Sequence, residues 1–367
     1  MSPITKRNII RILPFGLIWL VLGLVFMFVE YAAVGGFDNV ASTAIRVNGE
    51  ILLFASAAVT ALGLVIGAIE LIWLNRALSD KSFFVKILYK HLFYACFFFI
   101  IMLLLFPVAA SMELNVSYFD KKVWIKFSNF LTSLTSLSTS VQLGVSLLIS
   151  LLYAEISENI GQNVLLNFFT GKYHQPKEEM RIFMFLDMKS STTIAEKLGH
   201  IRYFELLKEY YNSFSHAIVS NCGEVYQYIG DEIVISWEYN RGLFNNSCIR
   251  TFLDMQDALQ KRADYFEKTF GVIPSFKAGM HTGLVTTGEI GALKKEIIFT
   301  GDVLNSTARI QGLCNKLNAD LLISKELIDM LPDDNKFLFT SVGEHELRGR
   351  EETIELFTLI KNVENVN

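Results

Sequence analysis

Four long apolar segments occupy the first 160 residues and limit the folds open to this chain. Each segment is long enough to cross a bilayer, because a helix needs about 20 apolar residues to do so. The segments cover residues 12–29, 51–74, 92–110 and 127–153. The first is too long for the apolar part of a signal peptide and lacks its small-residue cleavage site, so we expect it to be retained. The sequence therefore predicts an N-terminal all-α membrane domain, residues 1–153, with four transmembrane helices in a lipid bilayer.

Basic residues around these segments indicate their orientation. They lie before the first segment, between the second and third, and after the fourth: Lys6, Arg7, Arg11, Arg76, Lys81, Lys86, Lys90, Lys172, Lys177 and Arg181. Because cytoplasmic flanks carry the excess of Lys and Arg, we expect a multi-pass protein of the cell (inner) membrane with both termini cytoplasmic. Glu70 lies well inside the second segment. It either faces the bundle interior, which would make it a functional candidate, or lies near the end of its helix.

The stretch after the fourth segment, residues 154–179, reads as a helical linker. Its apolar residues recur at helical spacing until "GKYHQPKEE" breaks the pattern. These residues are Ile156, Ile160, Val164, Leu165 and Phe168. The linker is either a passive tether or a signalling element that sets the spacing of two catalytic domains.

Residues 180–367 alternate between strand-like and helix-like patterns. We expect strands over 181–187, 224–237 (a hairpin turning at Gly230–Asp231), 275–300 (a second hairpin), 320–324, 336–342 and 353–360. Long helices are expected after the first strand and over 247–269, and Asp302 is expected to cap a third. The first long helix should bury its apolar positions from Ile194 to Phe214. Together these elements predict an α+β domain with helices on one face of a mostly antiparallel sheet.

Two carboxylates follow apolar runs in this region, in "IFMFLDMKSST" and "VYQYIGDEIVISW". If the first two strands are joined by a right-handed crossover, they are parallel, and Asp187 and Asp231 lie at the same edge of the sheet. Converging carboxylates repel unless a cation lies between them, and Mg²⁺ favours carboxylates together with substrate phosphates. Alternatively, Asp187 is an ordinary helix N-cap and Asp231 an ordinary turn residue.

Hydroxyl and amide groups near these carboxylates suggest a nucleotide. Ser190, Ser191 and Thr192 begin the helix after Asp187, where free N–H groups suit phosphate oxygens. Asn305 and Arg309 are four residues apart on a predicted helix and so share a face. This pair suits a sugar oxygen and a phosphate, or it is a solvated helix face.

Charge and cysteine content exclude other classes. The net charge of −4 does not indicate a nucleic-acid surface. The four cysteines form no CxxC pair, so zinc is not indicated, and we expect free thiols in a reducing compartment.

Residues 180–361 resemble the class III nucleotidyl cyclases, which include adenylate and guanylate cyclases. The resemblance rests on the order and spacing of five motifs. The motifs are "FLDMKSST", "YQYIGDEIVISW", "AGMHTGLVTTGEIG", "FTGDVLNSTARIQGL" and "LRGREETIELFTL". The resemblance implies a ferredoxin-like, palm-type cyclase domain, residues 180–367, on the cytoplasmic side. It also implies cyclisation of a nucleoside triphosphate, with ATP favoured.

The resemblance assigns roles to individual residues. Asp187 and Asp231, with the carbonyl of Met188, would bind two Mg²⁺ or Mn²⁺ ions. Asn305 would orient the ribose, and Arg309 would stabilise charge on the α-phosphate. Arg348 or Arg350 would hold the outer phosphates. Because the family draws its metal and Asn/Arg residues from different subunits, a homodimer with shared sites is implied.

The sequence departs from the family at the positions that read the base. Gln227 stands where adenylate cyclases usually have Lys, and Ile298 stands where they have Asp or Thr. Guanylate cyclases favour Glu and Cys there. Ser190–Ser191 replaces the family's Gly-Phe. GTP, a pyrimidine triphosphate, or a nucleotide-binding module without turnover therefore stay open as alternatives. An enzyme that joins two nucleotides is disfavoured, because such an enzyme is expected to have a Gly-Gly-acid hairpin tip, whereas this chain has "IGDEI".

Overall fold

The computed structural model describes residues 2–33, 44–74, 77–78, 81, 83–332, 337–347 and 353–360. The chain divides into two compact units. The first to be described is Thr5–Leu166, and the second is Asn167–Asn367 together with Met1–Ile4. The domain boundaries expected at 153 and 179 stay predictions.

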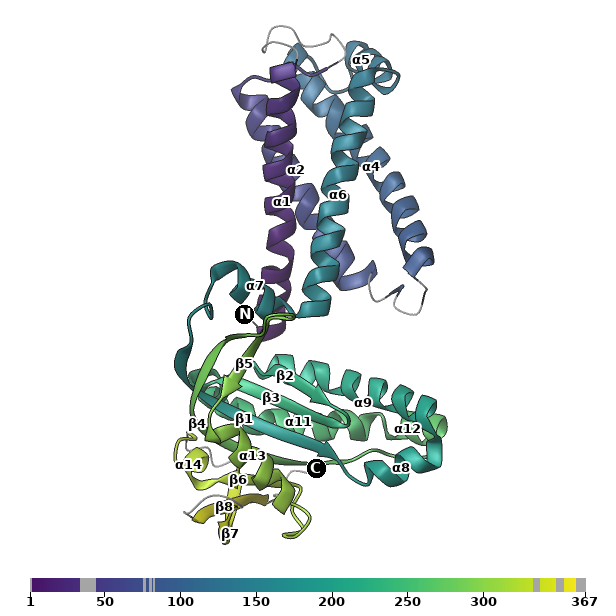
Figure 1. The fold of residues 1–367 in the computed structure, drawn as a ribbon. Helices are drawn as coiled ribbons and strands as arrows, with labels where there is room; N and C mark the ends of the chain where they lie inside the picture. The colour runs from purple at the N-terminus through teal and green to yellow at the C-terminus, as the bar shows by residue number, and fades with distance from the viewer. Residues whose placement is uncertain are drawn as a thin grey trace. The chain divides into compact units, whose positions relative to one another are not determined.

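The helical unit contains four helices long and apolar enough to cross a membrane, counted over the described residues. They are Pro3–Ala33, Gly49–Leu74, Leu88–Leu114 and Leu134–Ile160. In element terms the unit comprises α1 (Pro3–Ala33), α2 (Gly49–Ala68) with the π-helical η2 (Ile69–Leu74), α4 (Phe83–Leu114), α5 (Lys121–Leu131) and α6 (Leu134–Ile160). Figure 1 labels the α-helices of this unit. The predicted N-terminal region of four long apolar helices is therefore confirmed.

The fourth segment is shorter at its start than predicted, because residues 127–153 do not form one helix. α5 ends at Leu131, and the Ser133 side chain accepts a hydrogen bond from Ser136 N at 3.3 Å to begin α6. Thr132 and Ser133 also donate to backbone carbonyls of α5. Hydroxyl side chains that bond the nearby backbone compete with a continuous helix, which explains the break.

Glu70 faces the interior of the helical unit. Its side chain is fully buried, accepts a hydrogen bond from the Tyr94 hydroxyl at 3.0 Å and pairs with the Lys90 ammonium. A buried carboxylate needs such partners, because an unpaired charge is expensive to desolvate. Of the two sequence interpretations, the interior placement is confirmed, and a functional role stays a prediction.

The linker helix is interrupted. α6 ends at Ile160, Gly161 adopts a positive φ of 91°, and a separate helix, α7, covers Gln162–Thr170. The predicted single helix through Phe168 was therefore wrong, because a glycine with this backbone conformation ends the run. The predicted break after Thr170 is present as a turn.

The second unit is built on one mixed sheet. Its described strands are β1 (Lys177–Met188), β2 (Glu224–Ile229), β3 (Glu232–Glu238), β4 (Phe276–Ile290), β5 (Glu296–Thr300), β6 (Leu321–Ser324), β7 (Leu338–Glu346) and β8 (Thr353–Ile360). Their order is β2-β3-β1-β4-β6-β8-β7, and β5 pairs with β4. The β4–β6 pair is parallel and the other described pairs are antiparallel. The predicted mostly antiparallel sheet is confirmed.

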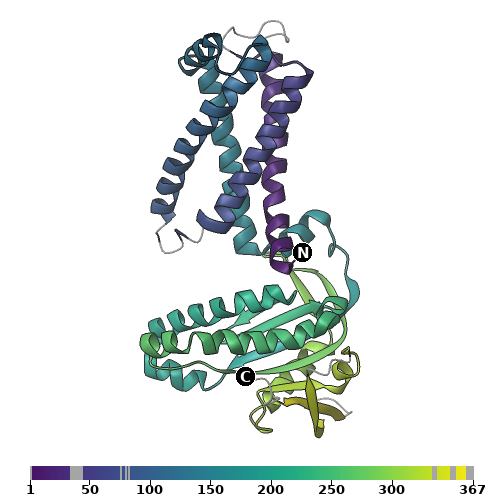
Figure 2. The ribbon, with the colours of Figure 1, turned by 180° about the vertical axis from the view of Figure 1, so that it is seen from behind.

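Helices cover both faces of this sheet, not one as expected. The described helices are α8 (Ser191–Leu198), α9 (His200–Ser220), α10 (Tyr239–Leu243), η3 (Phe244–Asn246), α11 (Ser247–Lys261), α12 (Ala263–Phe270), α13 (Asp302–Leu313) and α14 (Lys325–Ile328). α9 and α11 pack on Ile182, Met184 and Leu186 of β1, whereas α13 packs on the face of Phe183 and Phe185. Figure 2 shows the helices of the first face in front of the sheet. A strand that is apolar on both sides needs cover on both sides.

Three helix boundaries also differ from the predictions. Gly199, at φ +75°, separates α8 from α9, and the helix over 247–269 breaks at Arg262. On α9, Ile201 and Phe204 are 79% and 71% exposed, so the predicted apolar face is only partly buried. The N-cap of α13 is Gly301 rather than Asp302, which is the first helical residue.

Candidate active site

Asp187 and Asp231 lie at one edge of the sheet. β1 and β2 both run antiparallel to β3, so they are parallel to each other, as a crossover requires. In the β1–β3 register Asp187 is opposite Glu232, the neighbour of Asp231. A tight turn at Gly230–Asp231 joins β2 to β3, and Gly230 takes a φ of +63° there. The two carboxylates therefore converge although they are 44 positions apart in the sequence.

The charges of this acidic pair are only partly compensated. Burial raises the pKa of Asp187, the neighbouring Asp231 raises it further, and Lys277 lowers it. The Lys277 ammonium lies 3.4 Å from Asp187 Oδ2, and the Gln311 amide donates to the same oxygen at 3.4 Å. Asp231 Oδ2 is buried and has no hydrogen-bond partner among the described residues. A buried carboxylate oxygen without a donor fits a cation ligand.

The residues available for a cation also limit which cation fits. In the part of the chain that the structure describes, no group of three or more His, Cys, Asp or Glu side chains is arranged to hold a metal ion. The two carboxylates supply the oxygen donors that cations such as Mg²⁺ favour. Met188, whose carbonyl was the third predicted ligand, is the last residue of β1.

The start of α8 follows the acidic pair directly. Ser190 is the N-cap with a φ of +57°, in the left-handed region that favours glycine, and α8 begins at Ser191. The Ser190 side chain makes no capping hydrogen bond, and the side chains of Ser190 and Thr192 are exposed. As at the start of any helix, the first backbone N–H groups of α8 have no acceptor within the helix.

Asn305 and Arg309 share one face of α13, but another residue of that helix reaches Asp187. The contact comes from Gln311, six positions after Asn305. At 1.5 Å per residue, Asn305 lies about 9 Å away along the helix axis. Asn305 is exposed, while Arg309 Nη1 is buried with no hydrogen-bond partner among the described residues. Among the described residues, no hydrogen bond or ion pair joins Asn305 or Arg309 to Asp187 or Asp231.

A model of the family described as "Adenylate and Guanylate cyclase catalytic domain" matches residues 172–361, more than half of the chain. The chain belongs to this family.

Named relatives agree with this family. Adenylate cyclase 2 of Rhizobium meliloti (strain 1021) is 34% identical over 196 residues, which are 53% of this chain and 54% of that protein. The adenylate cyclase of Anabaena cylindrica is 26% identical over 181 residues, 47% of this chain and 35% of that protein. A solved bacterial light-regulated adenylyl cyclase superposes with a TM-score of 0.54 at 23% identity, covering 62% and 67% of the two chains. This chain thus spans about half or less of the two sequence relatives, and the solved structure supports the cyclase fold.

The two predicted base-reading positions of this cyclase domain lie on β2 and β5, which do not pair with each other but make contact through neighbouring residues. Tyr226 and Phe299, the neighbours of Gln227 and Ile298, have ring centroids 4.8 Å apart. A register shift after Val225 places Val225 opposite Ile235 but Gln227 opposite Val234. Because directly paired residues share a face, Gln227 lies on the α13 face and Val225 on the other. In a regular strand, residues two apart such as Val225 and Gln227 would share a face, and the bulge reverses this alternation. Arg348 and Arg350 lie outside the described residues.

Sequence reasoning missed several side chains around the acidic pair. Lys277 and Gln311 contact Asp187, and the tyrosines Tyr203, Tyr210 and Tyr211 of α9 lie close enough to the two carboxylates for their charges to act. Burial, then Asp231, raise the pKa of Tyr203 to about 12. The hydroxyl of Tyr210 is buried without a hydrogen-bond partner among the described residues. The spacing of Tyr203 and Tyr210, two helical turns apart, was the available signal.

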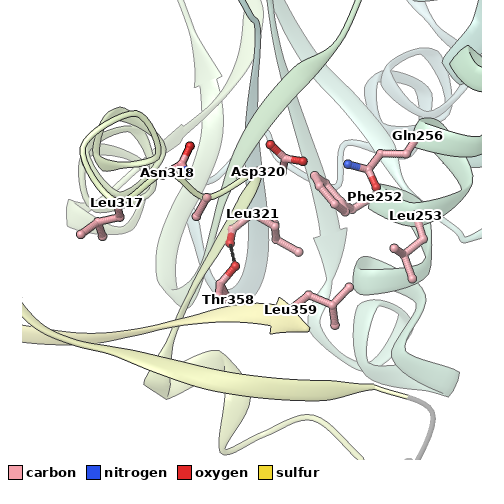
Figure 3. A pocket seen from close by; sticks show the side chains of 10 residues that line it. Phe252, Leu253, Gln256, Leu317, Asn318, Asp320, Leu321, Thr358 and Leu359 are labelled. Carbon is pink, nitrogen blue, oxygen red and sulfur yellow. Dashed lines mark hydrogen bonds between the residues drawn. The ribbon is translucent and has the colours of Figure 1, made fainter. Parts of the chain in front are cut away.

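A cavity of about 380 Å³ lies elsewhere in the cyclase domain (Figure 3). It is lined by Phe252, Leu253, Gln256, Leu317, Asn318, Ala319, Asp320, Leu321, Thr358 and Leu359. None of the predicted site residues lines it. Its Asp320 pairs with the Lys189 ammonium, next to Met188 in the chain.

Proposed function

We propose that this protein is a membrane-bound nucleotidyl cyclase that converts ATP into 3′,5′-cyclic AMP and pyrophosphate as a homodimer. The observation that carries the proposal is the undercompensated pair Asp187 and Asp231 at the sheet edge of a domain that belongs to the cyclase family. The relatives named adenylate cyclase favour ATP. Gln227 and Ile298 match neither the adenylate nor the guanylate pattern, so GTP or a pyrimidine triphosphate is the second candidate substrate.

Asp187, Asp231 and the Met188 carbonyl would hold two Mg²⁺ or Mn²⁺ ions. Such ions, when bound, lower the pKa of the attacking hydroxyl and offset the charge of the triphosphate. Oxygen donors at a strand end suit these cations. Ser190, Ser191 and Thr192 would bind phosphate oxygens through the first N–H groups of α8.

The remaining groups would come from a second copy of the chain. Asn305 would orient the ribose so that its 3′-hydroxyl attacks the α-phosphate in line, and pyrophosphate leaves. Arg309 would stabilise the charge that develops on the α-phosphate, since its buried Nη1 is a donor without a partner among the described residues. Arg348 and Arg350 would hold the outer phosphates. A two-fold dimer would bring this set to the acidic pair of the partner and make two equivalent sites.

The four long apolar helices support placement in the cell (inner) membrane, and the basic residues that flank them support an orientation with both termini cytoplasmic. In this proposal residues 1–153 span the membrane, residues 154–179 transmit signals, and residues 180–367 carry catalysis.

The test is to incubate the purified full-length protein in detergent with each of the four ribonucleoside triphosphates and Mn²⁺, and to identify products by mass. We expect a cyclic monophosphate and pyrophosphate, predominantly from ATP. An Asp187→Ala, Asp231→Ala double variant serves as the control for contaminating enzymes. Binding of nucleotide by the wild type without any cyclic product would favour the non-catalytic module instead.

A further inference from the structure

A buried guanidinium lies on β1 six residues before Asp187. The Arg181 side chain is 3% exposed. Its Nε donates to Glu179 at 2.9 Å, and its Nη1 lies 3.5 Å from a Glu224 oxygen and donates to Ser236 at 3.4 Å. A buried guanidinium with several directed partners is held in one position, because moving it away from both carboxylates would leave its charge uncompensated.

The same guanidinium contacts the segment that enters the cyclase domain. Tyr173, between α7 and β1, is only 2% exposed although it lies in a turn. Its hydroxyl accepts from Arg181 Nη2 at 3.3 Å and lies 3.2 Å from Glu179 Oε1. Its carbonyl accepts from Glu289 N of β4 at 3.1 Å. The entry segment is therefore fixed to the sheet at this residue.

On its other side Arg181 contacts β5. Its guanidinium carbon lies 4.8 Å from the centroid of the Phe299 ring, a cation–π contact. Phe299 also packs edge-on against Phe183 at 5.3 Å. Its register partner on β4, Thr287, donates to Glu179 at 2.7 Å, which ties β4 to the same buried network.

In the part of the sheet that the structure describes, β5 is hydrogen-bonded to a neighbouring strand on one side only. Among the described strands it pairs with β4 alone. It carries Ile298, which is opposite Gly288, and a Cβ at Gly288 would lie 3.4 Å from Pro176 of the entry segment. β5 then leads through Gly301 into α13, where Asn305 lies on the first turn. The position of β5 thus sets two residues that the proposed function places on the nucleotide.

We propose that Arg181 is a positioning residue that couples the entry segment at Tyr173 to β5, and through it to the ribose and base contacts at Asn305 and Ile298. The proposal rests on the proposed function for what these contacts bind. A displacement of the entry segment would move Ile298 and Asn305 through one buried guanidinium, while the acidic pair stays in place.

The first test measures local opening of β5 by hydrogen exchange in the full-length protein without nucleotide. Arg181→Met should raise amide exchange over residues 296–304 by about tenfold, because single-sided strands open locally. Tyr173→Phe, which removes only the hydroxyl, should give a smaller rise in the same peptide, and Arg181→Lys should partly restore protection. Arg262→Met is the matched control. Arg262 pairs with Glu209 at 2.7 Å and stacks on Tyr265 at 4.6 Å, on helices away from β5.

The second test is a double-mutant cycle with Tyr173→Phe and Phe299→Leu. If Arg181 couples them, the two effects on exchange and on KM for the triphosphate should be non-additive, with kcat changed less than KM. Additive effects, or an equal rise in exchange with Arg262→Met, would overturn the proposal. The hydrogen-exchange measurements need no turnover. A wild type that makes no cyclic product would therefore refute the proposed function, and the exchange results would still decide whether Arg181 couples the two segments.

Discussion

At the scale of single residues, the acidic edge holds groups whose ionised forms are poorly stabilised by the protein itself. Burial and Asp231 raise the pKa of Asp187, and burial with both aspartates raises the pKa of Glu232. Lys277 offsets this only in part. A bound cation would stabilise the ionised carboxylates of this site. Removal of the Asp187 charge should therefore lower activity but raise the stability of the metal-free protein.

Asp187→Asn should remove cyclase activity but raise the melting temperature of the metal-free protein, because it relieves the repulsion from Asp231. Scanning fluorimetry with and without Mn²⁺ measures the second effect, and Mn²⁺ should no longer stabilise the variant. Asp257→Asn, at an exposed position of α11, is the control and should change stability by less than about 0.5 kcal/mol. Near wild-type turnover in a folded Asp187→Asn protein would refute the metal assignment.

Base selection should respond to Gln227 and Ile298. An apolar Ile298 gives a purine amino group no acceptor, and an unmatched buried polar group costs about 1–3 kcal/mol. Gln227→Lys with Ile298→Asp should therefore raise the ATP-to-GTP ratio of kcat/KM by about tenfold or more. Competition assays with both triphosphates measure the ratio. An unchanged ratio in an active double variant would mean that other residues read the base.

The pKa of Glu179 gives a pH dependence with a defined sign. Burial would raise this pKa, but the hydrogen bond from Thr287 and the charge of Arg181 outweigh it, so the pKa lies below its usual 4.5. A carboxylate with a lowered folded-state pKa adds stability that is present above pH 4.5 and lost as pH falls through the folded pKa. Melting temperatures between neutral and acidic pH should therefore fall less steeply in Glu179→Gln. An unchanged acid slope in the variant would contradict this.

At the scale of elements, the close approach of α13 to β4 places the Asn/Arg face. A Cβ at Gly279 would lie 2.4 Å from the backbone nitrogen of Gln311, and one at Gly283 would lie 2.6 Å from Val303. The first contact meets the backbone of α13 and cannot form without movement of the helix, whereas the second requires the Val303 side chain to shift. The absence of two side chains on β4 thus determines where α13 and its functional residues lie.

Gly279→Ala should displace α13 and destabilise the cyclase domain by about 1–3 kcal/mol, as overpacking of a core does. Activity should fall with it, because Asn305 and Arg309 move. Gly312→Ala is the matched control: its Cβ would meet nothing within 4 Å, and it lies in the same helix. We expect Gly312→Ala to be neutral or stabilising by up to about 1 kcal/mol. Chemical denaturation followed by tryptophan fluorescence distinguishes the two, and equal effects would contradict the packing argument.

At the scale of the whole molecule, the proposed sites need two chains. Asp231→Ala and Arg309→Ala proteins should each be inactive. When they are co-expressed, one site of each heterodimer is complete, so a random mixture should regain about a quarter of the activity and pure heterodimer about half. Differently tagged chains purified in sequence isolate the heterodimer for the assay. No recovery in an isolated heterodimer would argue against shared sites.

The sequence by itself determined the features that a local pattern of residues encodes. The apolar lengths of the first half specify four long helices, and Asp187, Asp231, Asn305 and Arg309 were identified because each follows or lies on a recognisable local element. Tertiary structure decided the rest. Cover on both faces of β1, the bulge that turns Gln227, the reach of Gln311 and Lys277 to Asp187, and the burial of Arg181 between Tyr173 and Phe299 all depend on register between distant strands. Such contacts leave no periodic signal, because they join residues whose spacing in the sequence is arbitrary.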